Sequence, residues 1–447
     1  MTTSARPVST GVLASYGLGW IGGQVFRDVP ALALIPFMTT AIGVPPAVAG
    51  AAIFLPKLWV VICDPLMGFL SDRTTSKWGR RRPFLFWGSI LCGITMVMLF
   101  HVPALESGVA RGIYVGAIYL IASTAFSIYS VPYLTFASEL SNDTHQNTVV
   151  MHWRQMGLGL GLIAGNAMPL WLVSQGGGGA SGFAFMSWVL GAICFVTMFT
   201  TFAGTASVPV VVRPSHAAVP LKEQVRLVIQ NKPFLVLVAA NFVQLVGSAA
   251  GYGVTALYFI YFLDKSIDYL STFLLIMSVT AMLIPPVWTA ISRRIGKRAV
   301  YTLSAICFAA TYASLPFARG DGDVAIMLRA VCVAVFNGGF SLMAFSLMLD
   351  CIAHDRAISG LNREGVYSGI WSAMDKVAFA FGALLAGVLL SDFGFVESTE
   401  GFVPQSAQAI EGIAIILSGC VGVASILAAL IMTRFPLRDD PRAPASA

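Results

Sequence analysis

Charged residues are scarce in this sequence. Of its 447 residues only 11% are Asp, Glu, Lys or Arg, whereas an ordinary soluble domain carries roughly 25%. Apolar residues make up 57% of the chain. This balance excludes a soluble globular enzyme, a disordered chain and a disulfide-rich secreted domain. It is typical of a helical membrane protein, in which each span needs about 20 apolar residues.

Patterns of catalytic or metal-binding residues are also missing. The 5 histidines are scattered, and the chain has no metal-ligand spacing, nucleophile elbow or phosphate-binding loop. The 7 cysteines lie in or beside apolar runs without CxxC spacing, so we interpret them as small buried hydrophobes. We therefore expect no enzyme, no catalytic residues, no metal site and no bound cofactor.

The sequence instead contains a series of long apolar runs separated by glycine, proline or charged clusters. They predict twelve membrane-spanning helices, at residues 12–40, 47–71, 83–103, 112–138, 150–174, 183–207, 233–262, 269–291, 299–318, 324–349, 366–391 and 408–434. A polar linker with three prolines, 208–232, divides the chain. The expected fold class is an all-α membrane protein with one six-helix bundle in residues 1–207 and a second in residues 233–447.

The distribution of basic residues predicts the orientation of the helices. If both termini are cytoplasmic, most Lys and Arg residues fall in inner loops, among them the clusters at 77–82 and 293–298. Cytoplasmic loops of membrane proteins carry such an excess. We therefore expect both termini on the cytoplasmic side of the cell (plasma or inner) membrane. The same bias explains the net charge of +6 without a nucleic-acid partner.

The two halves of the sequence look related. Residues 154–165 and 376–387 both open with a basic residue and close with Ala-Gly after two aliphatic residues. Residues 79–81 (Gly-Arg-Arg) and 296–298 (Gly-Lys-Arg) match at nearly the same offset. Duplicated six-helix halves are typical of transporters that bind their substrate at the interface of the halves. We predict that Arg154 and Lys376, related by this repeat, both face that interface.

A motif around the second span carries a family resemblance. Residues 57–83 contain Asp-Pro-Leu-Met-Gly at 64–68, and five residues, 74–78, separate an Arg from the Gly-Arg-Arg of the following loop. With further matches at 16–19 and 131–133, this pattern resembles the major facilitator superfamily. More narrowly, it resembles the glycoside–pentoside–hexuronide:cation symporter family, whose best-known member is melibiose permease. The resemblance extends over nearly the whole chain.

The resemblance implies a secondary transporter that works by alternating access. Its substrate would be a sugar, a glycoside or a related small polar solute carried together with a cation. We expect a monomer whose partners are a small molecule and the lipid bilayer.

The loop after the second span is a candidate gate. Its basic cluster can pair with acidic groups and helix C-termini of the neighbouring half, which would hold the outward-facing state closed at the inside. The alternative is that the cluster only anchors the topology. The candidate gating residues are Asp72, Arg73, Gly79, Arg80, Arg81, Arg82 and Gly296.

Polar residues at helical spacing define a candidate substrate site. Stripes on the first and seventh spans, together with positions implied by the family, give Gln24, Arg27, Asp28, Ser130, Arg154, Asn241, Gln244, Trp371, Ser372 and Lys376. Charged residues inside a span usually face a partner or a water-filled cavity. Gly157, Gly161 and Gly165 on the fifth span are expected to allow close helix packing.

The sequence departs from the family pattern at the sugar site. The carboxylate that grips a galactoside in melibiose permease-like proteins corresponds to Gln24, and an acidic group of the fourth span corresponds to Ser130. The particular grip on a galactoside is therefore missing. Arg27 and Asp28 are additional charges that could bind an acidic or zwitterionic ligand.

The cation site is reduced as well. The family's sodium site uses two acids one turn apart. In this sequence the first position holds Val60, and the second holds Asp64. Ser127 and Ser130 are the nearby hydroxyls, and Lys376 is the expected basic neighbour. One carboxylate with two hydroxyls is a thin ligand set for sodium, but a single carboxylate suffices for a proton. We expect proton coupling first, sodium coupling second and uniport third.

Three other functions remain open at this stage. A lysolipid or amphipath carrier of the same fold would need a lateral opening beside the fifth and eighth spans. An organic-anion carrier is favoured by the charges of Arg27, Lys57 and Arg154. A transporter-derived sensor is disfavoured, because no soluble domain is attached to the spans.

Overall fold

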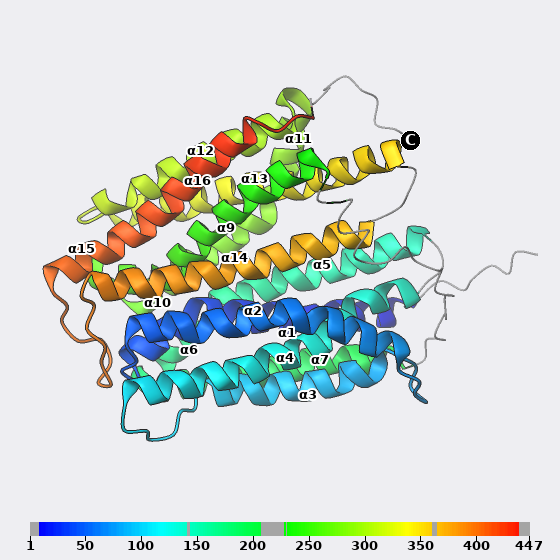
Figure 1. The fold of residues 1–447 in the computed structure, drawn as a ribbon. Coiled ribbons are helices and arrows are strands. Elements are labelled where there is room, and N and C mark those ends of the chain that lie inside the picture. Colours follow the sequence, from blue (N-terminus) through cyan, green and yellow to red (C-terminus); the bar gives the residue numbers. More distant parts are fainter. Residues whose placement is uncertain (1–8, 141–143, 207–227, 229, 360–363, 438–447) are drawn as a thin grey trace, which may run out of the picture.

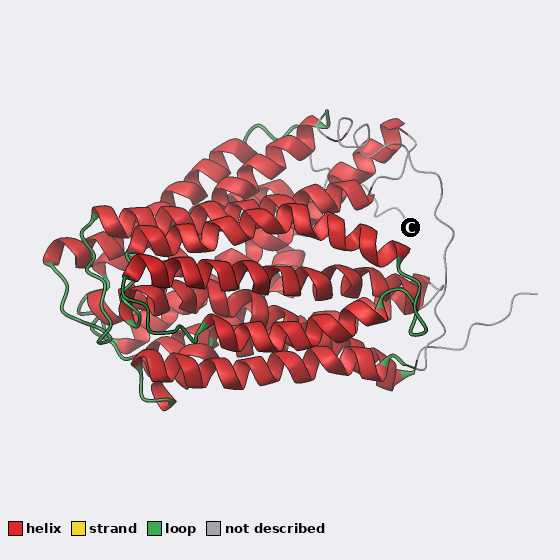
Figure 2. Cartoon of the chain, turned by 60° about the horizontal axis from the view of Figure 1, so that its bottom comes forward, coloured by secondary structure: helices red, strands yellow, loops and turns green. Residues whose placement is uncertain are grey.

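The computed structural model describes residues 9–140, 144–206, 228, 230–359 and 364–437. Throughout these residues the chain is helical and forms no strand (Figures 1 and 2). The helices run roughly along one axis, with loops gathered at two ends. We call the end where the helix beginning at Thr10 starts the terminal end, and the end with the loop 393–406 the distal end.

The N-terminal half, residues 9–206, contains seven helical elements in the described region. They are α1 (Thr10–Thr40), α2 (Pro46–Arg73), α3 (Arg82–Leu99), α4 (Gly108–Leu140), α5 (Thr144–Asn166), α6 (Met168–Gln175) and α7 (Gly179–Gly204). Most of the predicted linker 208–232 lies outside the described residues.

The C-terminal half, residues 228–437, follows a similar pattern. Its elements are α9 (Lys232–Leu257), the π-helical turn η1 (Tyr258–Phe262), α10 (Ile267–Leu283), α11 (Pro285–Ile295), α12 (Lys297–Ala313), the 3-10 turn η2 (Leu315–Phe317), α13 (Asp323–Ser359), α14 (Glu364–Asp392), α15 (Ala407–Ile415), the π-helical turn η3 (Ile416–Cys420) and α16 (Val421–Met432).

Each of the twelve predicted spans coincides with a helix or a broken helix. Within the described residues, 10 helices are long and apolar enough to cross a membrane, or 11 when the bent pair α10 and α11 counts as one. The remaining span is α1, with 31 residues. It is long enough, but Gln24, Arg27 and Asp28 make it less apolar than the others. The all-α membrane fold is confirmed.

Two predicted spans are interrupted next to prolines, contrary to expectation. The span 150–174 is divided into α5 and α6 just before Pro169, and the span 269–291 bends by 50° between α10 and α11, where Pro285 and Pro286 follow each other. Proline lacks the N–H group that continues the helical ladder, and its ring clashes with the preceding turn. The sequence contains these prolines, but proline is tolerated often enough in membrane helices that it does not reveal a break by itself.

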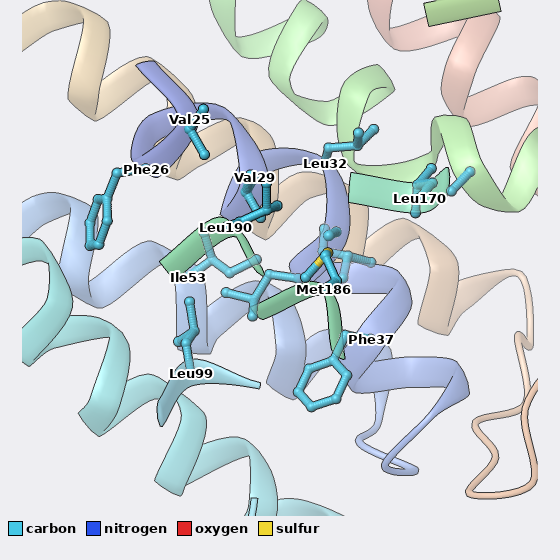
Figure 3. Close-up of a cluster of buried hydrophobic side chains, with 14 of the residues drawn as sticks. Val25, Phe26, Val29, Leu32, Phe37, Ile53, Leu99, Leu170, Met186 and Leu190 are labelled. Atoms are coloured by element: carbon cyan, nitrogen blue, oxygen red, sulfur yellow. The ribbon is translucent and has the colours of Figure 1, made fainter. Parts of the chain in front are cut away.

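Two clusters of buried apolar side chains show how the halves meet. The larger one runs through the N-terminal half (Figure 3) and continues into the distal part of the C-terminal half, where it includes Val254, Leu270 and Leu390. The smaller one lies in the C-terminal half, with residues nearer the terminal end such as Phe234 and Leu347. The halves therefore share a core at the distal end and have separate cores toward the terminal end.

Glycines bring α2 and α14 into close contact at the distal end. A Cβ atom added at Gly387 would lie 2.3 Å from the carbonyl oxygen of Pro46. One added at Gly50 would lie 2.9 Å from the carbonyl oxygen of Ala383. Real Cβ atoms cannot approach that closely, so larger residues would push the two halves apart here.

Candidate functional site

A carboxylate and an ammonium group meet between the two halves. Asp64 of α2 forms an ion pair through Oδ2 with Nζ of Lys376 on α14. Its other oxygen, Oδ1, accepts a hydrogen bond of 2.6 Å from Oγ of Ser127 on α4. The side chains of Asp64 and Lys376 are 20% and 27% exposed. Both carboxylate oxygens of Asp64 are thus engaged, one by each half of the molecule.

The other predicted members of the cation set contribute less. Val60, one turn before Asp64, is buried and has no side-chain oxygen. Ser130 is buried one turn after Ser127, and within the described residues the structure gives its hydroxyl no bond to Asp64. The ligands around Asp64 are therefore one hydroxyl and one ammonium group.

A second positive charge lies on α2 near this pair. Lys57, two turns before Asp64, places Nζ 5.5 Å from the ring centroid of Tyr119 on α4. An aromatic face attracts a cation in this arrangement. Lys57 also acts on Lys376 as a like charge, so the two ammonium groups repel each other while Asp64 pairs with Lys376.

The polar residues of α1 form a short hydrogen-bonded chain. Nε2 of Gln24 donates to Oδ2 of Asp28 at 2.7 Å. Nε of Arg27 donates to Oδ1 of the same carboxylate at 3.3 Å. The Gln24 residue is 1% exposed, whereas the side chain of Arg27 is 58% exposed and that of Asp28 is 12% exposed. The three residues have the expected helical spacing. The carboxylate of Asp28 accepts a hydrogen bond from both Gln24 and Arg27.

Glycines of α5 allow this polar stripe to lie against the neighbouring helix. A Cβ atom added at Gly161 would lie 2.6 Å from Cβ of Gln24. One added at Gly165 would lie 3.2 Å from Cβ of Asp28. Gly157 meets α1 one turn earlier in the same way. The close packing predicted for these three glycines is confirmed.

An aromatic stack continues the site along α1 and α4. The ring centroids of Trp20 and Tyr133 lie 5.0 Å apart, and those of Tyr133 and Tyr16 lie 4.4 Å apart, both pairs stacked. The guanidinium carbon of Arg154 lies 4.4 Å from the ring centroid of Trp20. Nε1 of Trp20 and Nε of Arg154 are buried without a hydrogen-bond partner. Sequence reasoning missed this stack, although its tyrosines belong to two motifs that support the family resemblance.

The residues predicted on α14 lie close to Lys376 in the chain but differ in exposure. Trp371 is buried, and its Nε1 has no hydrogen-bond partner. Its ring lies 5.5 Å from that of Phe345 on α13. Ser372 is exposed. Asp375 is partly buried and interacts electrostatically with Arg27 in the other half.

The polar residues of α9 lie in two environments. Asn241 and Gln244 are buried, and Nε2 of Gln244 donates to Oγ of Ser425 on α16 at 3.0 Å. This contact places Gln244 within the packing of the C-terminal half. Tyr252, two turns further on, donates a hydrogen bond to Oδ1 of Asn166 on α5. The structure therefore brings Tyr252, and not Gln244, into contact with the N-terminal half.

The predicted gate includes two arginines that are buried within the N-terminal half. Arg81 and Arg82 are 6% and 9% exposed. Arg81 donates to Oγ of Ser71, and Nη2 of Arg82 donates to the carbonyl oxygen of Phe202 at 2.9 Å. Both of these partners lie in the same half, and the contact expected with the neighbouring half concerns the outward-facing state.

The remaining residues of this loop are less enclosed. Arg73 is exposed and stacks at 4.0 Å on the ring of Phe69. Arg80 is partly buried. The side chain of Asp72 lies outside the described residues. The expected gating role of these residues stays a prediction.

The internal repeat is visible at the matching loop. Gly79 and Gly296 have φ angles of +86° and +89°, a conformation that residues with a Cβ rarely adopt. Arg298, which the repeat aligns with Arg81, donates to the carbonyl oxygen of Thr433 at 2.5 Å. Arg82, one residue after Arg81, makes a similar bond to the end of α7. Each half thus uses a buried or partly buried arginine to bind the carbonyl end of its last helix.

Comparison with known proteins assigns the family. The family model described as MFS/sugar transport protein matches residues 15–439. The chain belongs to the MFS/sugar transport family. It is a multi-pass membrane transporter of a small molecule, and not an enzyme.

Individual relatives support this assignment over nearly the whole chain. The isoprimeverose transporter of Lactiplantibacillus pentosus is 25% identical over 409 residues, which cover 89% of this chain and 83% of the relative. A candidate glycoside/cation symporter of Escherichia coli, YagG, is 23% identical over 86% of this chain and 83% of its own length. Among solved structures, a D-xylose-proton symporter superposes with a TM-score of 0.65 at 14% identity, covering 95% of this chain and 96% of the other.

Proposed function

We propose that this protein carries a sugar or glycoside across the membrane together with a proton. Membership of the MFS/sugar transport family and the relatives named as isoprimeverose transporter and glycoside/cation symporter support the substrate class. The observation that carries the coupling is the ion pair of Asp64 with Lys376, which joins the two halves.

The environment of Asp64 favours a proton over sodium. Lys376 places an ammonium group against one carboxylate oxygen, and Ser127 occupies the other. A sodium ion would have to displace that ammonium group and still find several hard oxygen ligands, for which Val60 offers none. A proton needs only the carboxylate itself. Protonation of Asp64 would remove the negative charge and release Lys376.

This exchange provides a physical basis for alternating access. While Asp64 is charged, its pair with Lys376 adds a bond between the halves in the middle of the molecule. When Asp64 is protonated, the bond weakens and the halves can change their contact at the two ends. We place the terminal end in the cytoplasm, following the distribution of basic residues. On that placement, the shared core at the distal end makes this the inward-facing conformation.

The proposed substrate site lies along α1, α5 and α14. Trp20 and Trp371 are buried, and each has an indole N–H group without a partner, a donor that can bind a sugar hydroxyl. Gln24 and Arg154 add polar atoms that lack partners in the protein, one acceptor and one donor. Buried polar atoms without partners are costly, so a hydroxyl-bearing ligand that supplies the missing hydrogen bonds fits this group.

The experiment that tests the function is uptake into proteoliposomes. Purified protein is reconstituted, and uptake of radiolabelled D-xylose and isoprimeverose is measured with the outside more acidic than the inside. We expect accumulation above the external concentration, absent in protein-free liposomes. Equal rates with and without protein for both sugars would contradict the proposal.

An acidic sugar is the second candidate substrate. The observation in its favour is the guanidinium group of Arg27, whose side chain is 58% exposed although it lies within a span. A relative in Escherichia coli, 22% identical over 96% of this chain, is named as a candidate sulfoquinovose importer. Competition between sulfoquinovose and D-xylose in the same uptake assay distinguishes the two candidates.

A further inference from the structure

The side-chain amide of Gln24 is satisfied at one end only. Nε2 donates to Oδ2 of Asp28 at 2.7 Å. Oε1 is buried and has no hydrogen-bond partner, and the residue as a whole is 1% exposed. A buried carbonyl acceptor calls for a donor. Because solvent hardly reaches this side chain, a bound ligand is a natural source of that donor.

The carboxylate of Asp28 determines which end of the amide faces it. A carboxylate only accepts hydrogen bonds, so it can bind the NH2 end of an amide but not the carbonyl end. Its other oxygen already accepts from Nε of Arg27 at 3.3 Å. The NH2 group of Gln24 must therefore turn toward Asp28, and its carbonyl oxygen must turn away.

The packing of α5 limits other arrangements of this side chain. A Cβ atom added at Gly161 would already lie 2.6 Å from Cβ of Gln24. The polar atoms left without a partner nearby are donors, Nε1 of Trp20 and Nε of Arg154. Oε1 of Gln24 is thus the acceptor in a group that otherwise donates hydrogen bonds.

We propose that Asp28 is a positioning residue, which fixes the amide of Gln24 so that its carbonyl oxygen accepts a hydrogen bond from a free hydroxyl of the substrate. The proposal rests on the sugar-binding role proposed above for Gln24. The proposal predicts which substrates bind: the substrate must have a hydrogen-bond donor next to the carbonyl oxygen of Gln24. A sugar in which that hydroxyl is replaced by fluorine can only accept, and two acceptors would then face each other.

The test compares a sugar with its single-fluorine analogues. Binding of D-xylose and isoprimeverose to the purified full-length protein is measured by isothermal titration calorimetry, followed by the monofluoro analogues of the tighter binder. We expect at least one analogue to bind the wild type roughly tenfold more weakly. We call the factor by which the analogue binds more weakly than the sugar the discrimination ratio. In Asp28→Asn this ratio should fall below about threefold. The amide introduced by this substitution can bond to either end of Gln24 and no longer orients it.

Two further variants make the result specific. Asp375→Asn removes a carboxylate of α14 that also senses Arg27 but makes no described bond to Gln24, so it should keep the wild-type ratio. The double variant Gln24→Glu, Asp28→Asn reverses donor and acceptor within the pair and leaves a carboxylate oxygen facing the ligand. It should restore the ratio, and it decides the question if Asp28→Asn alone fails to fold.

The outcomes separate this proposal from the proposed function. If the wild type binds neither sugar, the sugar-binding role fails and the positioning role fails with it. If the wild type binds a sugar but no analogue is discriminated, Gln24 does not accept from a hydroxyl. If Asp28→Asn discriminates as well as the wild type, only the positioning role of Asp28 is overturned. A general structural role would instead weaken the sugar and all its analogues equally.

Discussion

Asp64 and Lys376 form an ion pair that joins α2 of the N-terminal half to α14 of the C-terminal half. The pair lies on the terminal side of the point where glycines bring the same two helices into backbone contact. Removing one member of an enclosed ion pair leaves the other without compensation. The pair is therefore suited to respond to a change of charge on Asp64.

Asp64→Asn should leave the protein folded but abolish accumulation of substrate against a gradient. Asparagine has the same shape and can still accept from Ser127, but it can neither take up a proton nor pair with Lys376. Uptake under an imposed pH gradient measures the effect. The matched control is Asp323→Asn, which removes an aspartate paired with Lys265 at 2.9 Å and 68% exposed. Normal accumulation by Asp64→Asn would contradict the account.

Gly161→Ala should destabilise the protein by about 1–3 kcal/mol, because the added methyl group overpacks the seam between α1 and α5. Its Cβ would lie 2.6 Å from Cβ of Gln24. Thermal unfolding in detergent measures the change. Gly159→Ala is the control on the same helix, since its Cβ would lie 3.4 Å from the sulfur of Met282. Equal midpoints for the two variants would show that the seam is not as tightly packed as described.

Trp20→Phe should weaken sugar binding roughly threefold to tenfold, because it keeps an aromatic ring against Tyr133 but loses a buried hydrogen-bond donor. The thermal midpoint should change little. Calorimetry with the transported sugar measures the affinity. The control is Trp87→Phe, since Trp87 is 57% exposed on α3. An unchanged affinity in Trp20→Phe would remove Trp20 from the substrate site.

Arg82→Gln should lower the stability of the N-terminal half by about 1.5–3 kcal/mol, the usual contribution of a hydrogen bond to a charged group. Arg82 is buried and binds the carbonyl oxygen of Phe202. Thermal unfolding again provides the measurement. The exposed Arg73, changed to Gln, is the control and should have an effect within about 0.5 kcal/mol. A larger loss in Arg73→Gln than in Arg82→Gln would contradict this assignment.

The helices and the central charges could be predicted from the sequence. A long apolar run in a membrane chain forms a helix, because its backbone hydrogen bonds must be made within the segment. Each of the twelve predicted spans therefore coincides with a helix or a broken helix of the described residues. A charge inside such a run is costly unless it is paired, which is why Asp64 and Lys376 stand out in the sequence. The position of Lys376 at the interface of the halves agrees with the repeat.

The partners of individual side chains could not be predicted. A helical stripe shows that Gln244 and Tyr252 share a face, but only the rotation of α9 decides that Gln244 bonds to Ser425 and Tyr252 to Asn166. The contact of Arg82 with Phe202 depends on how α3 packs against α7, which the spacing of residues in the sequence does not reveal.

The most direct test of proton coupling is proton entry driven by the substrate itself. Proteoliposomes containing a trapped pH-sensitive dye receive the transported sugar, with sodium or potassium as the only alkali cation. The account predicts internal acidification on sugar addition, equal in both salts and absent in Asp64→Asn. Sugar uptake without acidification, or a tenfold or larger stimulation by millimolar sodium, would contradict it.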